Sequence, residues 1–176
     1  MTLQIGNTAP HFSLPATDDK SYTYDALKGD KGTVILFWCN HCPYVQGSEL
    51  RVIRLAGEFA TQGVKFAAIN ANRADSYVED DFPHMVERAK ALGYNFTYLH
   101  DESQEVARVF GAQRTPEAFL FDVDGKLRYH GRIDDNPQDE SAAKSHDLRN
   151  AIEVLLSGGN PDPAETGPIG CTIKWK

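Results

Sequence analysis

The chain has 176 residues, with 18 lysines and arginines against 25 aspartates and glutamates and a formal net charge of −7. This length fits a single domain over residues 1–176, long enough to bury a hydrophobic core without disulfides. Because the chain is acidic and has no basic stretch, we expect no nucleic-acid partner. No apolar run approaches the ~20 residues that span a bilayer, so we expect no membrane partner either.

The cysteines and the first residues bear on the cellular compartment. Three cysteines are too few for a disulfide scaffold, and their number is odd. Residues 1–6 lack the basic start and apolar run of a secretory signal, although a processed chain would look the same. We therefore expect a cytoplasmic protein.

Residues 1–30 predict an N-terminal β-hairpin extension. Phe12 and Leu14 alternate with polar residues between prolines, and residues 21–24 alternate again after a turn. A helical turn then ends at Gly29.

A strand, a helix and a second strand follow the hairpin. Residues 33–38 form a continuous apolar run, which is typical of a strand covered on both faces. The helix begins at Pro43, carries apolar residues at helical spacing as far as Phe59, and ends at Gly63. Another apolar strand covers residues 64–69. This order predicts two parallel strands joined by a right-handed crossover.

The remaining sequence predicts an α/β fold in which a mixed sheet is flanked by helices. The elements expected there are, in chain order, a polar loop over 70–80, a helix from Asp80-Asp81 to Gly93, an extended segment over 96–99, a short helix capped by Ser103 and ended by Gly111, a strand over 117–121, its antiparallel partner over 126–133, a helix over 146–157 and a tail over 158–176.

Cys39 and Cys42 stand where the first long strand meets its helix. Two cysteines at this spacing in a helix start lie within the reach of a disulfide. An apolar, β-rich run before them and a helical pattern after them are the context of a redox motif. The alternatives are half of a zinc site or two buried thiols, but a structural zinc needs four ligands and the sequence has no second cysteine pair. We therefore predict a redox-active dithiol and no metal site.

The two thiols are expected to have different roles. Unpaired N–H groups at a helix start stabilise a thiolate, which is the reactive form of cysteine. We expect Cys39 to lie nearer the solvent and to attack a substrate disulfide. Cys42, one turn in, would then resolve the mixed disulfide.

The chain resembles the thioredoxin superfamily in its strand order, in the Trp-Cys-x-x-Cys-Pro turn of residues 38–43 and in Thr115-Pro116 directly before a strand. Residues 6–14 and 115–122 are similar to the peroxiredoxin and membrane-tethered thiol-reductase branch. With the ending Gly-Cys-Thr-Ile-Lys-Trp over 170–175, the whole chain resembles the peroxiredoxin-like, thioredoxin-fold proteins described as probable thiol-disulfide isomerases.

This resemblance implies a thioredoxin-like fold and an enzyme that exchanges its Cys39–Cys42 dithiol with protein or small-molecule disulfides. It also implies that Pro116 is cis and lies against the dithiol, where Thr115 and Pro116 shape a groove whose backbone pairs with an extended peptide. No cofactor is required, because the electrons come from an external dithiol. The sequence leaves open whether the protein is a monomer or a homodimer.

Two departures from the family patterns affect the chemistry. Peroxiredoxins carry a hydroxyl residue three positions before the reactive cysteine, where this chain has Leu36. Thioredoxins carry a buried acid on the strand before the dithiol, and residues 33–38 contain none. Glu117 beside Pro116 is the candidate proton acceptor for Cys42, with an exposed glutamate at a strand start as the alternative.

Residues around the dithiol are expected to have supporting roles. The His41 imidazole would stabilise the Cys39 thiolate, a feature that resembles the strongly oxidising thiol oxidases, unless it is a solvent-facing histidine with little influence. Asn40 would donate a hydrogen bond to sulfur, Trp38 would offer substrate a packing surface, and Pro43 would open the helix.

Cys171 is either an inert thiol in a tail packed on the domain or a third redox thiol, which would accept the disulfide from Cys39 or pair between subunits. A relay requires the tail to bring Cys171 near Cys42.

Two rival functions use the same residues. One is a thiol peroxidase in which Cys39 reacts with peroxide, which the missing hydroxyl disfavours. The other is a soft-metal carrier built from the cysteines and a histidine.

Overall fold

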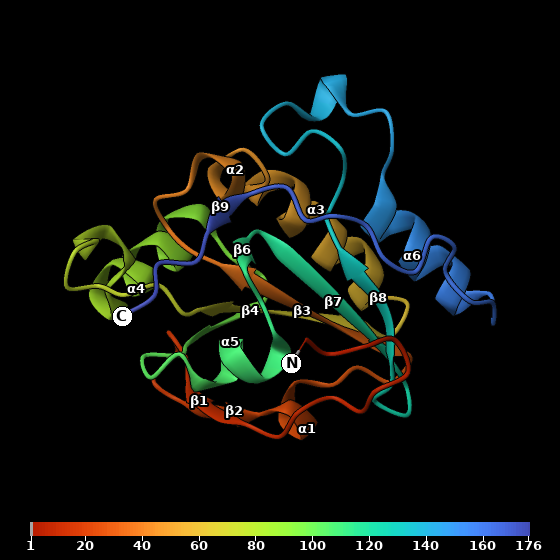
Figure 1. Ribbon diagram of the computed structural model, residues 1–176, viewed down its shortest axis with the longest axis horizontal. Coiled ribbons are helices and arrows are strands. Elements are labelled where there is room, and N and C mark those ends of the chain that lie inside the picture. Colours follow the sequence, from red (N-terminus) through yellow and green to blue (C-terminus); the bar gives the residue numbers. More distant parts are fainter. Residues whose placement is uncertain (1) are drawn as a thin grey trace.

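Figure 1 shows the computed structural model, which describes residues 2–176 and is built around a five-stranded sheet in the order β5-β4-β3-β7-β8. Its strands are β3 (Gly32–Trp38), β4 (Val64–Asn70), β5 (Thr97–His100), β7 (Glu117–Asp122) and β8 (Leu127–Gly131). The first three are parallel, while β7 and β8 run antiparallel to their neighbours. The predicted mixed sheet is therefore confirmed.

β3 lies at the centre of the sheet because both of its faces are apolar. All of its residues are buried, as the continuous apolar run predicted. It pairs with β4 through Trp38 opposite Asn70, and with β7 through Phe37 opposite Glu117. The strand therefore delivers Cys39 to the middle of the edge where the parallel strands end.

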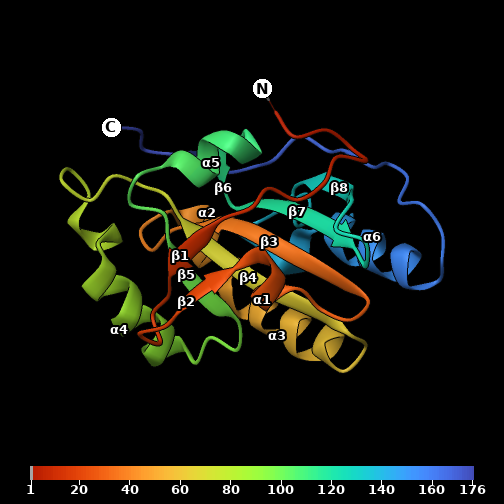
Figure 2. The ribbon, with the colours of Figure 1, turned by 90° about the horizontal axis from the view of Figure 1, so that it is seen from below.

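Helices cover both faces of the sheet (Figures 1 and 2), and they include α1 (Tyr24–Leu27), α3 (Glu49–Ala60), α4 (Phe82–Leu92), α5 (Glu105–Phe110) and α6 (Asp147–Leu156). Residues of α3, α4 and α6 share one core cluster with Val34 and Leu36 of β3. Residues of α1 and α5 share a second cluster with Ile35 and Phe37. Alternate residues of β3 therefore contribute to two separate cores.

The N-terminal extension is the predicted hairpin. It consists of β1 (Ser13–Pro15) and β2 (Ser21–Thr23), which pair antiparallel. Ala16 forms a bridge to Leu99, so the hairpin covers the β5 edge of the sheet. Covered edges are less open to pairing with another chain.

The single helix predicted after Cys42 is broken in two. α2 (Pro43–Gln46) ends at Gly47, and α3 begins after Ser48. A Cβ atom on Gly47 would lie 2.6 Å from the carbonyl oxygen of Pro137, and the Ser48 hydroxyl donates to that oxygen at 3.1 Å. The loop around Pro137 packs into the break, and no local pattern in the sequence predicts this contact.

Most helix ends follow their predicted signals. Asp81 caps α4 by accepting a first-turn backbone N–H at 2.9 Å, and Gly93 ends the helix with φ of 65°. One cap is displaced: Gln104, in the left-handed region, occupies the N-cap position of α5 without a side-chain cap bond, while the Ser103 Oγ accepts the Glu105 N–H at 3.2 Å from one position earlier. Two short 3₁₀ turns complete the helical elements described here, η1 (Val78–Asp80) and η2 (Glu140–Ala142). Within residues 2–176, no helix combines the length and apolar character needed to cross a membrane.

The C-terminal tail returns to the body of the molecule twice. Its first part runs along β8, where the His130 N–H donates to the Ala164 carbonyl at 3.0 Å. Its second part forms β9 (Cys171–Thr172), which pairs antiparallel with β6 (Arg114–Thr115). The tail therefore covers the β8 edge of the sheet and then reaches the segment that leads into β7.

Candidate active site

Cys39 and Cys42 lie in the turn that joins β3 to α2. Cys39 follows the last strand residue, and Cys42 is the N-cap of α2, directly before Pro43. Both side chains are fully buried, with 0% of their surface exposed. The expectation that Cys39 lies nearer the solvent is therefore wrong, because neighbouring segments cover both sulfurs.

Thr115 contacts both sulfurs. The Cys39 Sγ lies 3.4 Å from the Thr115 Oγ1, and the Cys42 thiol donates to the Thr115 carbonyl oxygen at 3.4 Å. The following bond, Thr115–Pro116, is cis, as the resemblance implied. The dithiol therefore rests against the segment before β7.

The two thiols differ in acidity. The hydrogen bond between them raises the pKa of Cys39, as do burial and the negative charge of Asp80. The same hydrogen bond lowers the pKa of Cys42 to about 4 against the effect of burial, with help from the Cys171 thiol and the Val45 backbone N–H. These shifts favour a thiolate on Cys42 over one on Cys39, because hydrogen-bond donors reach the Cys42 sulfur while a carboxylate lies near the Cys39 sulfur.

A buried carboxylate that the sequence did not single out organises the turn between the cysteines. Asp80, the last residue of η1, is fully buried. Its Oδ1 accepts the backbone N–H groups of Asn40 at 2.7 Å and His41 at 3.2 Å. Its Oδ2 accepts from the Asn72 side chain at 2.9 Å and faces His41 Nδ1. The sequence offered one signal for the role of Asp80. Only Asp81 is needed to cap α4, so the neighbouring aspartate was free for another role.

His41 lies between Asp80 and the dithiol. Its ring stacks on Tyr77 with 5.2 Å between centroids, and 24% of its side chain is exposed. A nitrogen of His41, an oxygen of Asp80 and the Cys39 sulfur lie within 4.8 Å of one another. Three such groups could hold a metal ion, but both Asp80 oxygens already accept hydrogen bonds. We interpret the cluster as a thiol beside an imidazole–carboxylate pair, which can take up and return a proton.

Two of the predicted supporting residues face inward instead. Trp38 is fully buried and its Nε1 donates to the Tyr94 hydroxyl at 3.1 Å, so it offers no surface to substrate. The Asn40 amide donates to the Glu79 carbonyl at 2.8 Å and accepts from the Tyr98 hydroxyl at 2.7 Å. The expected hydrogen bond from Asn40 to sulfur is therefore replaced by bonds that fix the turn.

Glu117 is buried, but its carboxylate has other partners than the dithiol. Its Oε2 accepts the backbone N–H groups of Gln113 and Arg114, each at 2.8 Å, and its Oε1 lies 2.6 Å from His130 Nε2. Because Glu117 is opposite Phe37 in the sheet, its side chain lies on the face that packs against α5. It is thus neither the proton acceptor expected for the dithiol nor an exposed residue, and it fixes the loop before β7.

Cys171 is brought to the same place by β9. It pairs directly opposite Thr115 in the β6–β9 ladder. It is partly buried and packs against the core cluster that contains Cys39 and Cys42. The backbone of Thr115, which was expected to pair with a substrate peptide, is therefore paired with the tail of the chain itself.

A cavity of about 420 Å³ opens beside the turn between the cysteines. Asn40, His41 and Gln46 line it from the turn and α2, and Arg88 lines it from α4. The cavity therefore borders His41, a ring nitrogen of which lies within 4.8 Å of the Cys39 sulfur.

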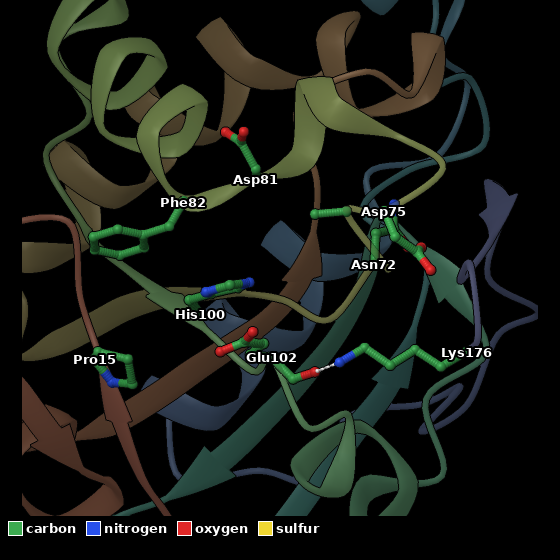
Figure 3. A pocket seen from close by; sticks show the side chains of 9 residues that line it. Pro15, Asn72, Asp75, Asp81, Phe82, His100, Glu102 and Lys176 are labelled. Atoms are coloured by element: carbon green, nitrogen blue, oxygen red, sulfur yellow. Dashed lines mark hydrogen bonds between the residues drawn. The ribbon is translucent and has the colours of Figure 1, made fainter.

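Figure 3 shows a second cavity, of about 610 Å³, lined by the hairpin, the start of α4 and the end of the tail. Phe82 and His100 lie at one end with their rings 5.7 Å apart, and Asp75 and Lys176 lie at the other. Asn72 lines this cavity and donates to the buried carboxylate beneath the dithiol turn. A molecule bound here could therefore contact Asn72, which is hydrogen-bonded to Asp80.

Comparison with known proteins agrees with this geometry. The AhpC/TSA family model matches residues 5–130. The chain is 28% identical to the thiol-disulfide oxidoreductase ResA of Halalkalibacterium halodurans over 124 residues, which are 70% of this chain and 66% of that protein. It is 26% identical to the thiol:disulfide interchange protein DsbE of Escherichia coli over 76% of this chain and 68% of that protein. The chain thus spans about two thirds of the length of these curated relatives.

Solved structures confirm the thioredoxin-like fold. An uncharacterized conserved protein from Geobacillus kaustophilus is 40% identical, with a TM-score of 0.93 over 99% of this chain and 94% of that one. A putative thioredoxin from Neisseria meningitidis is 26% identical, with a TM-score of 0.60 over 71% of this chain and 79% of that one. The first likeness extends over the hairpin and the tail as well as the central sheet.

Proposed function

Since this chain belongs to the AhpC/TSA family, we propose that it is a thiol-disulfide oxidoreductase whose Cys39–Cys42 pair exchanges with protein or small-molecule disulfides. The observation that carries the proposal is a pair of hydrogen-bonded thiols that rest on Thr115 and hold a stabilised thiolate. An inert core cysteine has no need of a stabilised thiolate, whereas Cys42 needs one to attack the mixed disulfide that Cys39 forms with the substrate. The relatives named ResA and DsbE support the same class of reaction.

The first half of the reaction is the attack of Cys39 on the substrate disulfide. As the Cys39 sulfur bonds to one substrate sulfur, the substrate S–S bond breaks and the other sulfur leaves as a thiolate. The proton of Cys39 passes to the neighbouring His41–Asp80 pair and from there to the departing thiolate. Cys42 keeps its negative charge throughout this step.

The second half is resolution by Cys42. Its thiolate attacks the Cys39 sulfur, the mixed disulfide breaks, and the second substrate thiolate leaves. A Cys39–Cys42 disulfide remains, and the two electrons of the dithiol have passed to the substrate. An external dithiol then reduces this disulfide, so the cycle uses no bound cofactor.

Trapping the mixed disulfide tests this assignment. Reduced protein with Cys42→Ser and Cys171→Ser should form a stable adduct with a small aromatic disulfide through Cys39, located by mass spectrometry of its peptides. Wild-type protein should instead release both substrate thiols and end as the Cys39–Cys42 disulfide, because Cys42 resolves the adduct. A Cys39→Ser protein that turns over the disulfide at the wild-type rate would overturn the proposal.

Peroxide reduction is a second candidate, and it rests on the Thr115 hydroxyl. This hydroxyl lies 3.4 Å from the Cys39 Sγ and provides a group that the sequence lacks at Leu36. The complete burial of Cys39 restricts the access of peroxide and of disulfides alike, so it does not separate the two functions. The two functions are separated by mixing reduced protein with micromolar hydrogen peroxide and following Trp38 emission. Completion within seconds indicates a peroxidase, whereas oxidation no faster than that of free cysteine leaves disulfide exchange.

A further inference from the structure

β9 places Cys171 on the face of the β6–β9 ladder that looks toward the dithiol. Directly opposed residues of an antiparallel pair project from the same face, with Cβ atoms about 4.5–5.5 Å apart. Cys171 is opposite Thr115, whose Oγ1 lies 3.4 Å from the Cys39 Sγ and whose carbonyl accepts from Cys42. The three cysteine sulfurs therefore converge on one threonine.

The tail is fixed on both sides of Cys171. A Cβ atom on Gly170 would lie 2.2 Å from the Thr115 carbonyl oxygen, so a glycine is needed for this close approach. On the other side, Ile173 is 3% exposed and the Lys174 N–H donates to the Asn72 Oδ1 at 2.9 Å. Cys171 is thus held beside the dithiol by packing and hydrogen bonds.

Exposure distinguishes the three sulfurs. Cys39 and Cys42 have no exposed surface, whereas Cys171 is partly exposed. An external thiolate must touch one sulfur of the disulfide that it reduces. Because Cys171 is the least buried of the three cysteines, a disulfide that includes it is more open to such attack than the Cys39–Cys42 disulfide.

Resting on the proposed function, we propose that Cys171 is a third redox residue through which an external dithiol reduces the oxidised site. In the first step the Cys171 sulfur attacks Cys42 in the Cys39–Cys42 disulfide. The bond between Cys42 and Cys171 forms, the bond to Cys39 breaks, and the proton of Cys171 passes to Cys39. This step moves the disulfide without any net gain or loss of electrons.

The second step consumes the external dithiol. One thiolate of the dithiol attacks Cys171, Cys42 leaves as a thiolate, and the second thiol of the reductant releases Cys171 while the reductant becomes a disulfide. The two electrons of the reductant thereby reach the site through the least buried of the three cysteines.

Ionisation of the three thiols supports this order of events. The pKa of Cys42, lowered to about 4, makes it a good leaving group when Cys171 is attacked. Burial and the hydrogen bond to Cys42 raise the pKa of Cys171 to about 11 in the reduced protein. Oxidation of Cys42 removes the charge that contributes to this shift, so Cys171 becomes easier to ionise when it is needed.

A Cys39→Ser chain isolates Cys42 and Cys171. Oxidised with one equivalent of diamide, it should lose two thiols and form an intrachain Cys42–Cys171 disulfide at a rate independent of protein concentration. Peptide mapping without reduction identifies the link. Thr172→Ala in the same background is the matched control, since Thr172 is the exposed neighbour of Cys171 on β9 and should not affect the yield. Disulfide-linked dimers in place of the intrachain bond would overturn the proposal.

Two half-reactions, each followed by stopped flow, separate this proposal from the proposed function. Wild-type and Cys171→Ser proteins are compared in oxidation by a small aromatic disulfide and in reduction by dithiothreitol. Cys171→Ser should slow the reduction about tenfold or more beyond any effect on the oxidation, because the exposed point of attack is lost. Equal effects on both halves would overturn the relay and leave dithiol exchange intact. A wild-type protein that is not oxidised by the disulfide would instead overturn the proposed function.

Discussion

At the scale of single residues, the acidity of the dithiol is set by the groups that reach each sulfur. Cys42 receives hydrogen bonds from the Cys39 thiol, the Cys171 thiol and the start of α2, whereas Cys39 lies near the Asp80 carboxylate. These groups come from four separate parts of the chain. The charge distribution within the Cys-x-x-Cys motif is therefore a property of the fold around it.

The Cys42 thiolate should be visible in a titration of the reduced protein. Its far-ultraviolet absorbance should persist at neutral pH and disappear as the pH falls through about 4, because folding lowers the pKa of Cys42 to that value. The same shift stabilises the reduced folded state above the pKa of an unfolded thiol, and this stabilisation is lost as the pH falls through the folded-state pKa. Cys42→Ser should remove the transition, with circular dichroism as a check on folding. A thiolate that titrates only near pH ~8.5, the value of a free cysteine, would contradict this charge distribution.

Asp80→Asn should make the dithiol a stronger oxidant. The reduced dithiol carries a negative charge and the disulfide carries none, so removing the Asp80 charge beside Cys39 stabilises the reduced form and makes the reduction potential less negative. The new amide also meets the Asn72 amide, so we expect a loss of about 1–3 kcal/mol in stability.

Asp81→Asn is the matched control for Asp80→Asn, because Asp81 carries the adjacent charge but serves as the cap of α4. It should leave the reduction potential unchanged. Equilibration of each protein with mixtures of reduced and oxidised dithiothreitol measures the potentials. Equal shifts in the two variants would show that the effect is not specific to the buried carboxylate.

At the scale of elements, the site depends on pieces of chain too short to form alone. α2 has 4 residues, and β6 and β9 have 2 residues each. Isolated helices and strand pairs of this size are not stable in water. They persist because close backbone contacts hold them, at Gly47 against Pro137 and at Gly170 against Thr115.

Gly170→Ala tests the contact between β9 and β6. Its Cβ would lie 2.2 Å from a backbone oxygen, so the tail must shift, at a cost of about 1–3 kcal/mol. Cys171 should then react faster with a maleimide in the native protein. Gly167→Ala is the control, because a Cβ there has no neighbour within 4 Å. Identical labelling rates and unfolding midpoints for the two variants would show that the close approach does not hold the tail.

At the scale of the whole molecule, a buried ion pair joins the helical layer to the segment after β8. The Arg51 guanidinium of α3 is 2.5 Å from Asp134 and donates to the Asn136 carbonyl at 3.0 Å. The next residue, Pro137, packs against Gly47 in the break between α2 and α3. The ion pair therefore contributes to the position of the turn that carries the dithiol.

Arg51→Leu should destabilise the protein by about 3–5 kcal/mol, because it leaves the Asp134 carboxylate buried without its partner. Adding Asp134→Leu should recover most of the loss, since no charge then remains buried. Arg54→Leu removes an exposed pair with Glu140 on the same helix and should cost less than about 1 kcal/mol. Urea unfolding measures all three variants. Equal losses for Arg51→Leu and Arg54→Leu would contradict the distinction.

The features that the sequence predicted have local causes. The apolar run of β3 indicates a strand buried on both faces, and Asp81 and Gly93 mark the ends of α4. The Cys39–Cys42 spacing placed the dithiol at a strand–helix junction, as the structure has it. In each case the residues that cause the structure lie within a few positions of the element itself.

The features that the sequence missed have non-local causes. Asp80 is 40 positions from Asn40, whose N–H it accepts. Trp38 was expected to offer substrate a packing surface because it adjoins the dithiol, yet its indole is buried and donates a hydrogen bond to the Tyr94 hydroxyl. The position of Cys171 depends on its pairing with Thr115, which no pattern in the tail predicts.

The order in which the chain is made follows from the position of β9. β9 comes after every other part of the site, so a ribosome synthesises Cys39, Cys42 and Thr115 well before Cys171. Folding that begins at the N-terminus during synthesis can assemble the sheet while the partner of β6 is still missing. The nascent chain can therefore hold Cys39 and Cys42 in the folded sheet before Cys171 is synthesised. Pairing of β9 with β6 then completes the site.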